Sequence, residues 1–350
     1  DTTMSAPNTD RGTARELATA DAYSLAAIPW QESLRRAYRN PLEVLDVLGL
    51  GNYANEIDDR PGFPFLVPRE FVKKMRPGDF GDPLLRQVLS LKIETREING
   101  FDRDPTTESR FHVQAGLLQK YAHRALIITT GGCAINCRYC FRRDYPYQQA
   151  VGRERFDAIV DTLKNDVEIT EVILSGGDPL SLTDRQLYNL IARLDAISHL
   201  KRLRIHTRMP LTIPQRLDTD LPRMLRDSRL DVALVIHANH ANEIDDAVSL
   251  RLRKLHRHGI VLLNQSVLLR NVNDSAEALI ALSERLFSAS VLPYYVHLLD
   301  RVSGAAHFEV PLSSAHALEG ELTRCLPGYL VPKFVREVPG ELAKTTIHRL

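Results

Sequence analysis

The sequence contains little cysteine, little net charge and no long apolar segment, and each shortage excludes a class of protein. Four cysteines in 350 residues do not make the disulfide framework of a secreted domain, so we expect a reducing, cytoplasmic location. No apolar run approaches the roughly 18 residues of a membrane span, and residues 1–15 lack the apolar core of a signal peptide. A net charge of +1 with scattered basic residues predicts no nucleic-acid surface.

Three of the cysteines lie in one short loop. Cys133, Cys137 and Cys140 have the spacing C-x3-C-x2-C and follow a β-type apolar run at 125–130 and a glycine pair. A structural zinc site needs four closed ligands, whereas a 4Fe–4S cluster held by three thiolates leaves one iron open to a small molecule. The spacing therefore predicts three cluster ligands and resembles that of radical S-adenosylmethionine (radical SAM) enzymes.

A zinc site or a redox cluster completed elsewhere in the chain is the alternative. The fourth cysteine, Cys325, has no partner at ligand spacing, and the loop contains no histidine. We therefore predict that Cys325 is a buried apolar residue. His237 and His240, which follow a later strand, suggest a metal, but a polar barrel rim is the favoured interpretation.

Apolar runs separated by about 30 residues predict repeated βα units in the second part of the chain. Helices are expected to begin at a capping box, Thr183 to Gln186, and near Asp274. Six βα units are too few for a closed barrel of eight, so we predict an α/β fold with a partial (βα)6 TIM-like barrel, whose chemistry gathers at the C-terminal strand ends. The expected strands are 126–130, 172–175, 203–207, 232–237, 261–269 and 294–298.

The expected division of the chain has three parts. Residues 1–20 are predicted to be a disordered tail. Residues 21–108 form an N-terminal helical region with breaks at Asn40-Pro41 and at 61–64. Residues 109–350 form the barrel and a C-terminal segment.

Two polar motifs fall on the expected strands. Gly176, Gly177 and Asp178 follow the second strand, where the glycines allow close backbone approach and the acid can accept from an ammonium group. A simple turn is the alternative. Gln265 interrupts the fifth strand, and a buried amide needs a partner, which is either a core network or a cofactor edge.

These motifs resemble the lysine 2,3-aminomutase family from about residue 82 to Lys344. Within the family the chain is most similar to a short bacterial branch that supplies (R)-β-lysine for modification of elongation factor P. The resemblance implies conversion of L-α-lysine to (R)-β-lysine, which a separate ligase uses, without direct contact with elongation factor P. The matching stretches are 82–87, 121–124, 133–143, 175–180, 264–269, 273–274, 293–295, 304–308 and 328–333.

The resemblance also implies three cofactors: the 4Fe–4S cluster, S-adenosylmethionine and pyridoxal 5′-phosphate. The reduced cluster would cleave S-adenosylmethionine to a radical that takes hydrogen from the substrate, while pyridoxal phosphate supplies the π-system for amino migration. The glycine-rich element at 176–178 aligns with the part that holds the S-adenosylmethionine amino group. Lys344 aligns with the Schiff-base lysine, although the family's glycine run before it is here Gly-Glu-Leu-Ala. An electron donor for the cluster is implied.

The resemblance to the family also implies roles for further residues. Arg124 would meet the pyridoxal phosphate group, with Tyr121 near the ring, and surface charge and packing are the alternative. Arg142 would bind the substrate carboxylate in a bidentate manner. Asp300 and Glu337 would bind the distal ammonium of lysine, and Glu337 stands where the family usually has aspartate. Two acids favour lysine over glutamate, which they would repel.

Two rival functions stay open at this stage. One is another radical SAM enzyme on the same scaffold, such as a glutamate aminomutase or a nucleic-acid modifier. The acid pair argues against the first and the missing basic patch against the second. The other rival is a non-catalytic zinc- or cluster-binding module, which predicts zinc in place of about four irons per chain. The sequence leaves homo-oligomerisation open.

Overall fold

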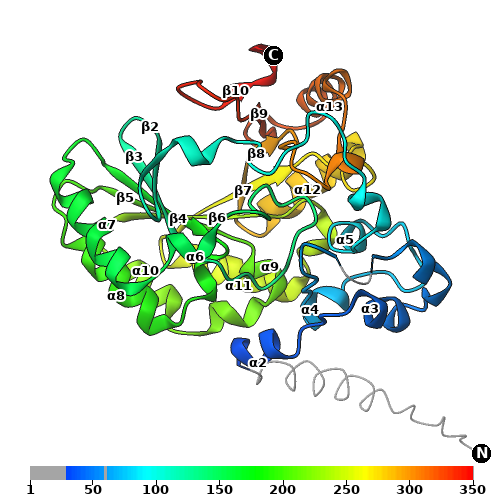
Figure 1. The fold of residues 1–350 in the computed structure, drawn as a ribbon, viewed down its shortest axis with the longest axis horizontal. Helices are drawn as coiled ribbons and strands as arrows, with labels where there is room; N and C mark the ends of the chain where they lie inside the picture. The colour runs from blue at the N-terminus through cyan, green and yellow to red at the C-terminus, as the bar shows by residue number, and fades with distance from the viewer. Residues whose placement is uncertain (1–28, 59–60, 350) are drawn as a thin grey trace, which may run out of the picture.

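A ten-stranded open sheet organises the chain (Figure 1). The structure, a computed structural model, describes residues 29–58 and 61–349. The predicted tail at 1–20 and the start of the predicted helical region therefore lie outside the described residues. Within the described ranges, no helix is both long and apolar enough to span a bilayer.

Six parallel strands form the centre of the sheet, each paired with the next along the chain. All six strands predicted from the apolar runs are present, which confirms the partial barrel. β4 is almost entirely buried, whereas in β5 buried residues alternate with the exposed or half-buried side chains of Arg202, Arg204 and His206. The strands are β3 (Arg124–Thr130), β4 (Glu171–Gly176), β5 (Arg202–Thr207), β6 (Asp231–Ile236), β7 (Val261–Val267) and β8 (Leu292–His297).

Helices connect these strands and bury their apolar faces against the sheet. The predicted capping box opens α8, where the Thr183 hydroxyl accepts from the Gln186 amide and the Gln186 side chain accepts from the Thr183 amide. Ser275 caps α12 in the same region of the sequence that predicted a helix start. The helices are α6 (Tyr147–Ala150), α7 (Arg153–Asn165), α8 (Asp184–Asp195), α9 (Met209–Thr212), α10 (Leu221–Asp227), α11 (Asp246–Arg257), α12 (Ala276–Ser288) and α13 (Leu312–Cys325).

Four short strands that sequence patterns did not predict extend the sheet at both ends. The antiparallel strands β1 (His112–Gln114) and β2 (Leu117–Tyr121) precede β3. On the other side β9 (Lys333–Arg336) runs parallel to β8, and β10 (Thr345–Thr346) is antiparallel to β9. They are too short and too mixed in polarity to show a period of two. Within the described residues β1 and β10 do not pair, so the barrel stays open.

The short helices α3 (Pro41–Val47), α4 (Arg69–Val72) and α5 (Pro83–Arg86) form a second, smaller core beside the barrel. Helix α2 (Trp30–Arg35) instead packs Trp30 into the barrel core. Ile135, from the cysteine loop, packs into the smaller core. Lys74 also donates to the backbone oxygens of Leu211 and Glu243, at 2.9 Å each. The N-terminal region is therefore joined to the barrel beside the cysteine loop.

The prediction for Cys325 is wrong. This cysteine is exposed in the last turn of α13, where its sulfur lies 3.5 Å from the Glu321 carboxylate. The helix buries another face, through Ala315 and Leu322. Local sequence does not reveal which side of a weakly amphipathic helix meets the core.

Candidate active site

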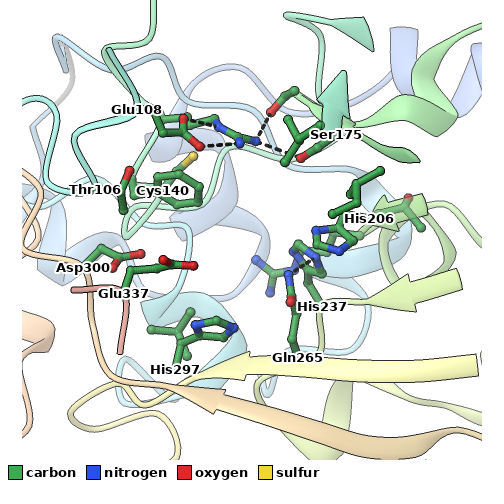
Figure 2. A pocket seen from close by; sticks show the side chains of 18 of the residues that line it. Thr106, Glu108, Cys140, Ser175, His206, His237, Gln265, His297, Asp300 and Glu337 are labelled. Atoms are coloured by element: carbon green, nitrogen blue, oxygen red, sulfur yellow. Dashed lines mark hydrogen bonds and ion pairs between the residues drawn. The ribbon is translucent and has the colours of Figure 1, made fainter. Parts of the chain in front are cut away.

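The cavity at the C-terminal strand ends brings together all the residues that were predicted to bind the cluster, a cofactor or the substrate. It has a volume of about 380 Å³ and reaches from the cysteine loop to the C-terminal segment. Figure 2 shows part of its wall, and the lining residues come from strands β2, β3, β4, β5, β7 and β8 and from adjoining loops. The predicted residues that line it are Cys133, Cys137, Cys140, Gly176, Gly177, Asp178, Tyr121, Arg124, Gln265, Arg142, Asp300, Glu337 and Lys344.

The three loop cysteines form a donor set that suits a metal cluster. Burial raises the pKa of Cys133 well above its usual range, with Asp178 and the other two loop cysteines adding to the shift, and burial together with Cys137 raises the pKa of Cys140 to about 11. Three crowded thiolates need a positive centre to be stable. The loop lies so close to Gly177, which follows β4, that a Cβ atom at this position would be only 2.3 Å from the Gly132 carbonyl oxygen.

A buried arginine that sequence patterns missed contacts this loop. Arg208 is 5% exposed, and its guanidinium donates to Cys137 Sγ at 2.7 Å. It also donates to the fully buried Glu243 at 2.9 Å and to Gln87 Oε1 at 2.6 Å. The Tyr139 hydroxyl completes the group at 2.8 Å. A cation beside a cluster ligand stabilises negative charge there. The only signal in the sequence is the position of Arg208 directly after a predicted strand.

Asp178 is already saturated by donors from the protein. Its buried carboxylate accepts from the Thr207 hydroxyl and the Arg208 amide, both at 2.7 Å, and from the amides of Leu180 and Met209. In this arrangement Asp178 joins the ends of β4 and β5. The polar backbone of Gly176 and Gly177 stays at the cavity wall beside it.

Arg142 is held by Glu108, an acidic residue that the sequence patterns did not indicate. Its guanidinium forms a bidentate pair with Glu108, at 2.7 and 2.6 Å, and a 2.8 Å hydrogen bond with the Ser175 hydroxyl (Figure 2). Glu108 belongs to a short 3-10 helix, Glu108–Arg110, that follows Thr107 in a left-handed conformation with φ of 52°. This segment has no hydrophobic period, so the sequence gives no sign that it faces the cavity.

Two lysines and a tyrosine contact the Glu337 carboxylate. Lys120 and Tyr121 are more than two hundred residues away in the sequence, and Lys344 is seven residues away. Lys344 Nζ donates to Glu337 Oε1 at 2.5 Å, and Lys120 Nζ donates to Oε2 at 2.8 Å. The Tyr121 hydroxyl also donates to Oε2. Burial alone raises the pKa of Glu337, but the Lys344 charge and these three hydrogen bonds outweigh it and lower the pKa to about 2. Glu337 is therefore ionised throughout the physiological range.

Asp300 lies beside Glu337 and differs from it in having no hydrogen-bond partner for its carboxylate among the described residues. In Figure 2 both carboxylates face the same part of the cavity. Burial raises the pKa of Asp300 to about 7, with Lys344 opposing the shift and Glu337 adding to it. The two acids are thus adjacent, but only one is neutralised by the protein.

Neutral histidines line the centre of the cavity. Burial lowers the pKa of His237 to about 3 and holds those of His206 and His297 well below the usual value. Gln265 Nε2 lies 2.8 Å from His237 Nε2. In contrast, the Nε2 atoms of His206 and His297 and the Nε atom of Arg124 are buried and have no hydrogen-bond partner among the described residues.

These unpaired polar atoms are the best test of cofactor fit, because buried polar groups normally have partners. Arg124 also stacks on the Tyr121 ring, 4.9 Å from its centroid. A cavity with a flat aromatic wall, a free guanidinium edge and an amine at Lys344 suits a planar aldehyde that carries a phosphate. Sequence patterns did not identify His206 or His297. No group of metal-ligand atoms within the described residues includes His237 or His240, and His240 instead caps a short helix.

Comparison with known proteins identifies the class and then the family. Residues 127–282 match the Radical SAM superfamily, the class defined by a three-cysteine loop on a partial barrel. The L-lysine 2,3-aminomutase of Escherichia coli K12 is 45% identical over 322 residues, which are 91% of this chain and 94% of that protein. The chain therefore belongs to the lysine 2,3-aminomutase family.

Two further matches span most or part of the chain. The L-lysine 2,3-aminomutase of Buchnera aphidicola is 42% identical over 323 residues, 91% of this chain and 95% of that protein. The crystal structure of Streptococcus suis SuiB bound to S-adenosylmethionine is 16% identical, covers 64% of this chain and 52% of that chain, and has a TM-score of 0.47.

Proposed function

We propose that this protein is a radical SAM lysine 2,3-aminomutase that converts L-α-lysine into (R)-β-lysine. The observation that carries the proposal is the single cavity in which the cysteine loop, Lys344 and the acid pair Asp300 and Glu337 meet. The close similarity to L-lysine 2,3-aminomutases over 91% of the chain supports it.

The cavity offers a place for each cofactor that the family implies. Cys133, Cys137 and Cys140 would hold the 4Fe–4S cluster, and the glycine-rich element Gly176, Gly177 and Asp178, together with Gln265, would hold S-adenosylmethionine. Lys344 would bind pyridoxal phosphate covalently, with Arg124 at its phosphate and Tyr121 at its ring. When bound, these groups supply the radical that takes a hydrogen atom and the π-system that supports amino migration.

The two acids determine which substrate is favoured. A distal ammonium group near Asp300 and Glu337 is attracted by both carboxylates, while a distal carboxylate is repelled. Glu337 already holds Lys344 and Lys120, so Asp300 is the acid with capacity for a new cation. The site therefore favours lysine over glutamate.

Arg142 is the group proposed to bind the substrate carboxylate, and the structure adds a condition to that role. Its guanidinium nitrogens already contact Glu108 and Ser175. A substrate carboxylate that binds the same Nε and Nη2 edge would take the place of the Glu108 carboxylate, which has the same charge and geometry. Glu108 would thus keep the arginine oriented until the substrate arrives.

We also propose the cellular setting from the resemblance to the short bacterial branch. In it a separate ligase attaches the product to elongation factor P, the enzyme acts in the cytoplasm, and an electron donor reduces the cluster. The scattered surface charge gives no sign of nucleic-acid binding.

An anaerobic assay tests the activity. Cluster-containing protein is incubated with dithionite, S-adenosylmethionine, pyridoxal phosphate and either L-lysine or L-glutamate, and products are separated by chiral chromatography. We expect (R)-β-lysine from lysine, its loss in Lys344→Ala, and its retention in Lys254→Ala, a matched control on the exposed face of α11. Cleavage of S-adenosylmethionine without β-lysine would show that the substrate is wrong, and zinc in place of iron would overturn the radical mechanism.

A further inference from the structure

A group of metal-ligand side chains outside the cavity joins the C-terminal segment to α13. His316 and Glu319 are three residues apart on α13, so their side chains are neighbours on one face of the helix. His348 comes from the terminal 3-10 helix, Ile347–Arg349. The ligand atoms of all three residues lie within 4.8 Å of one another. Figure 1 shows the C-terminal end of the chain beside α13.

Two contacts fix the arrangement before any metal binds. His348 Nε2 lies 2.8 Å from a Glu319 carboxylate oxygen, and the rings of His316 and His348 have centroids 5.9 Å apart. Ile347, next to His348, is fully buried in the core cluster that also contains Leu322 of α13. The backbone that carries His348 is therefore anchored by packing, so only side chains need to adjust.

The donor set and spacing suit a zinc ion. Two imidazoles and one carboxylate are the ligands of many zinc sites, and ligand atoms bonded at about 2.1 Å in a tetrahedron are about 3.4 Å apart. From the present positions, the pair His348 and Glu319 opens by a few tenths of an ångström and His316 moves inward. The His348 side chain is 67% exposed, so the ion can enter from solvent and water can take the fourth position.

We propose that His316, Glu319 and His348 form a divalent-metal site of the zinc type that fastens the C-terminal segment to α13. The segment begins at Lys344, four residues before His348, and its strand β10 contributes only two residues to the edge of the sheet. A metal bridge would add a cross-link where backbone pairing is short. The metal site stands on its own contacts and does not depend on the aminomutase activity.

Zinc titration of the cluster-containing protein tests the proposal. The protein is kept anaerobic so that iron occupies the loop cysteines, and zinc is added in competition with a chromophoric chelator while the cluster absorbance is followed. We expect one zinc per chain beyond the iron, and about a tenfold or greater loss of affinity in each of His316→Ala and His348→Ala. Cobalt in place of zinc should give the visible absorption of a tetrahedral site, and both variants should lose it.

His256→Ala is the matched control, because His256 is an exposed histidine on α11. It should bind zinc as the wild type does. Hydrogen exchange of the amides at 345–347 provides a second measurement, and zinc should slow it in the wild type and in His256→Ala but not in His348→Ala. Zinc affinity weaker than about 1 mM in the wild type, or equal affinity in the double variant His316→Ala/His348→Ala, would overturn the proposal.

Discussion

The acid with no hydrogen-bond partner, Asp300, should give lysine turnover a distinctive pH dependence. Its pKa is raised to about 7, mainly by burial. A raised pKa means that the carboxyl group is protonated below about pH 7 and ionised above it. The side-chain ammonium of lysine has a pKa of about 10.4 and stays charged, so the attraction is present at high pH and is lost as the pH falls.

The size of the effect follows from the ionised fraction. With a pKa of about 7, Asp300 is about 90% ionised at pH 8 and about 10% ionised at pH 6. Because kcat/KM reports the ionisation of the free enzyme, we expect it to fall about tenfold between these two pH values. Asp300→Asn should remove this dependence and lower kcat/KM at pH 8 about 100-fold, which corresponds to the ~3 kcal/mol lost when one partner of a buried ion pair is deleted.

The assay is initial-rate formation of β-lysine at saturating S-adenosylmethionine, from pH 6 to pH 8. Cleavage of S-adenosylmethionine in the absence of lysine, measured in parallel, corrects for pH effects on the cluster. Asp246→Asn is the matched control, since the side chain of Asp246 is fully exposed on α11, and it should keep the wild-type profile. A flat kcat/KM profile in the wild type, or an unchanged profile in Asp300→Asn, would refute the role of Asp300.

Three further predictions concern the surroundings of the cysteine loop and of Arg142. Gly177→Ala should lower the iron content and reduce the free energy of unfolding in urea by about 1–3 kcal/mol, because the new methyl group would lie 2.3 Å from the Gly132 carbonyl oxygen. Gly62→Ala is the control, since its methyl group has free space, and it should behave as the wild type. Arg208→Gln should lower the reduction potential of the cluster by on the order of 100 mV in a potentiometric titration, since a cation next to Cys137 is lost; an unchanged potential would contradict this. Glu108→Gln should lower the KM for lysine by weakening the competitor for Arg142, and a raised KM would show that Glu108 only supports the site.

The sequence determined the features whose cause is local. The spacing of Cys133, Cys137 and Cys140 brings three sulfurs into one loop whatever the rest of the chain does. The apolar runs predicted all six parallel strands, because most of the residues that these strands bury are apolar and lie close together in the sequence. The capping box of α8 was visible for the same reason, since its two partners are three residues apart.

Side-chain partners from distant parts of the chain were beyond local patterns. Glu108 reaches Arg142 from a segment without hydrophobic period, and Arg208 reaches Cys137 across 71 residues. Cys325 was predicted to be buried but is exposed, because α13 packs against the core through a different face. None of these contacts leaves a periodic or spacing signal.

The part of the chain from Glu337 onward shows the division most clearly. The resemblance to a family identified Lys344 and Glu337, which are seven residues apart. Only the tertiary structure placed Lys120 and Tyr121 on the same carboxylate, across 217 and 216 residues, and His348 against α13. The sequence by itself therefore determined the cysteine loop and the six parallel strands, and its resemblance to a family indicated the reaction class. The tertiary structure decided the charge state of each acid, because burial and distant partners set the pKa of a carboxyl group.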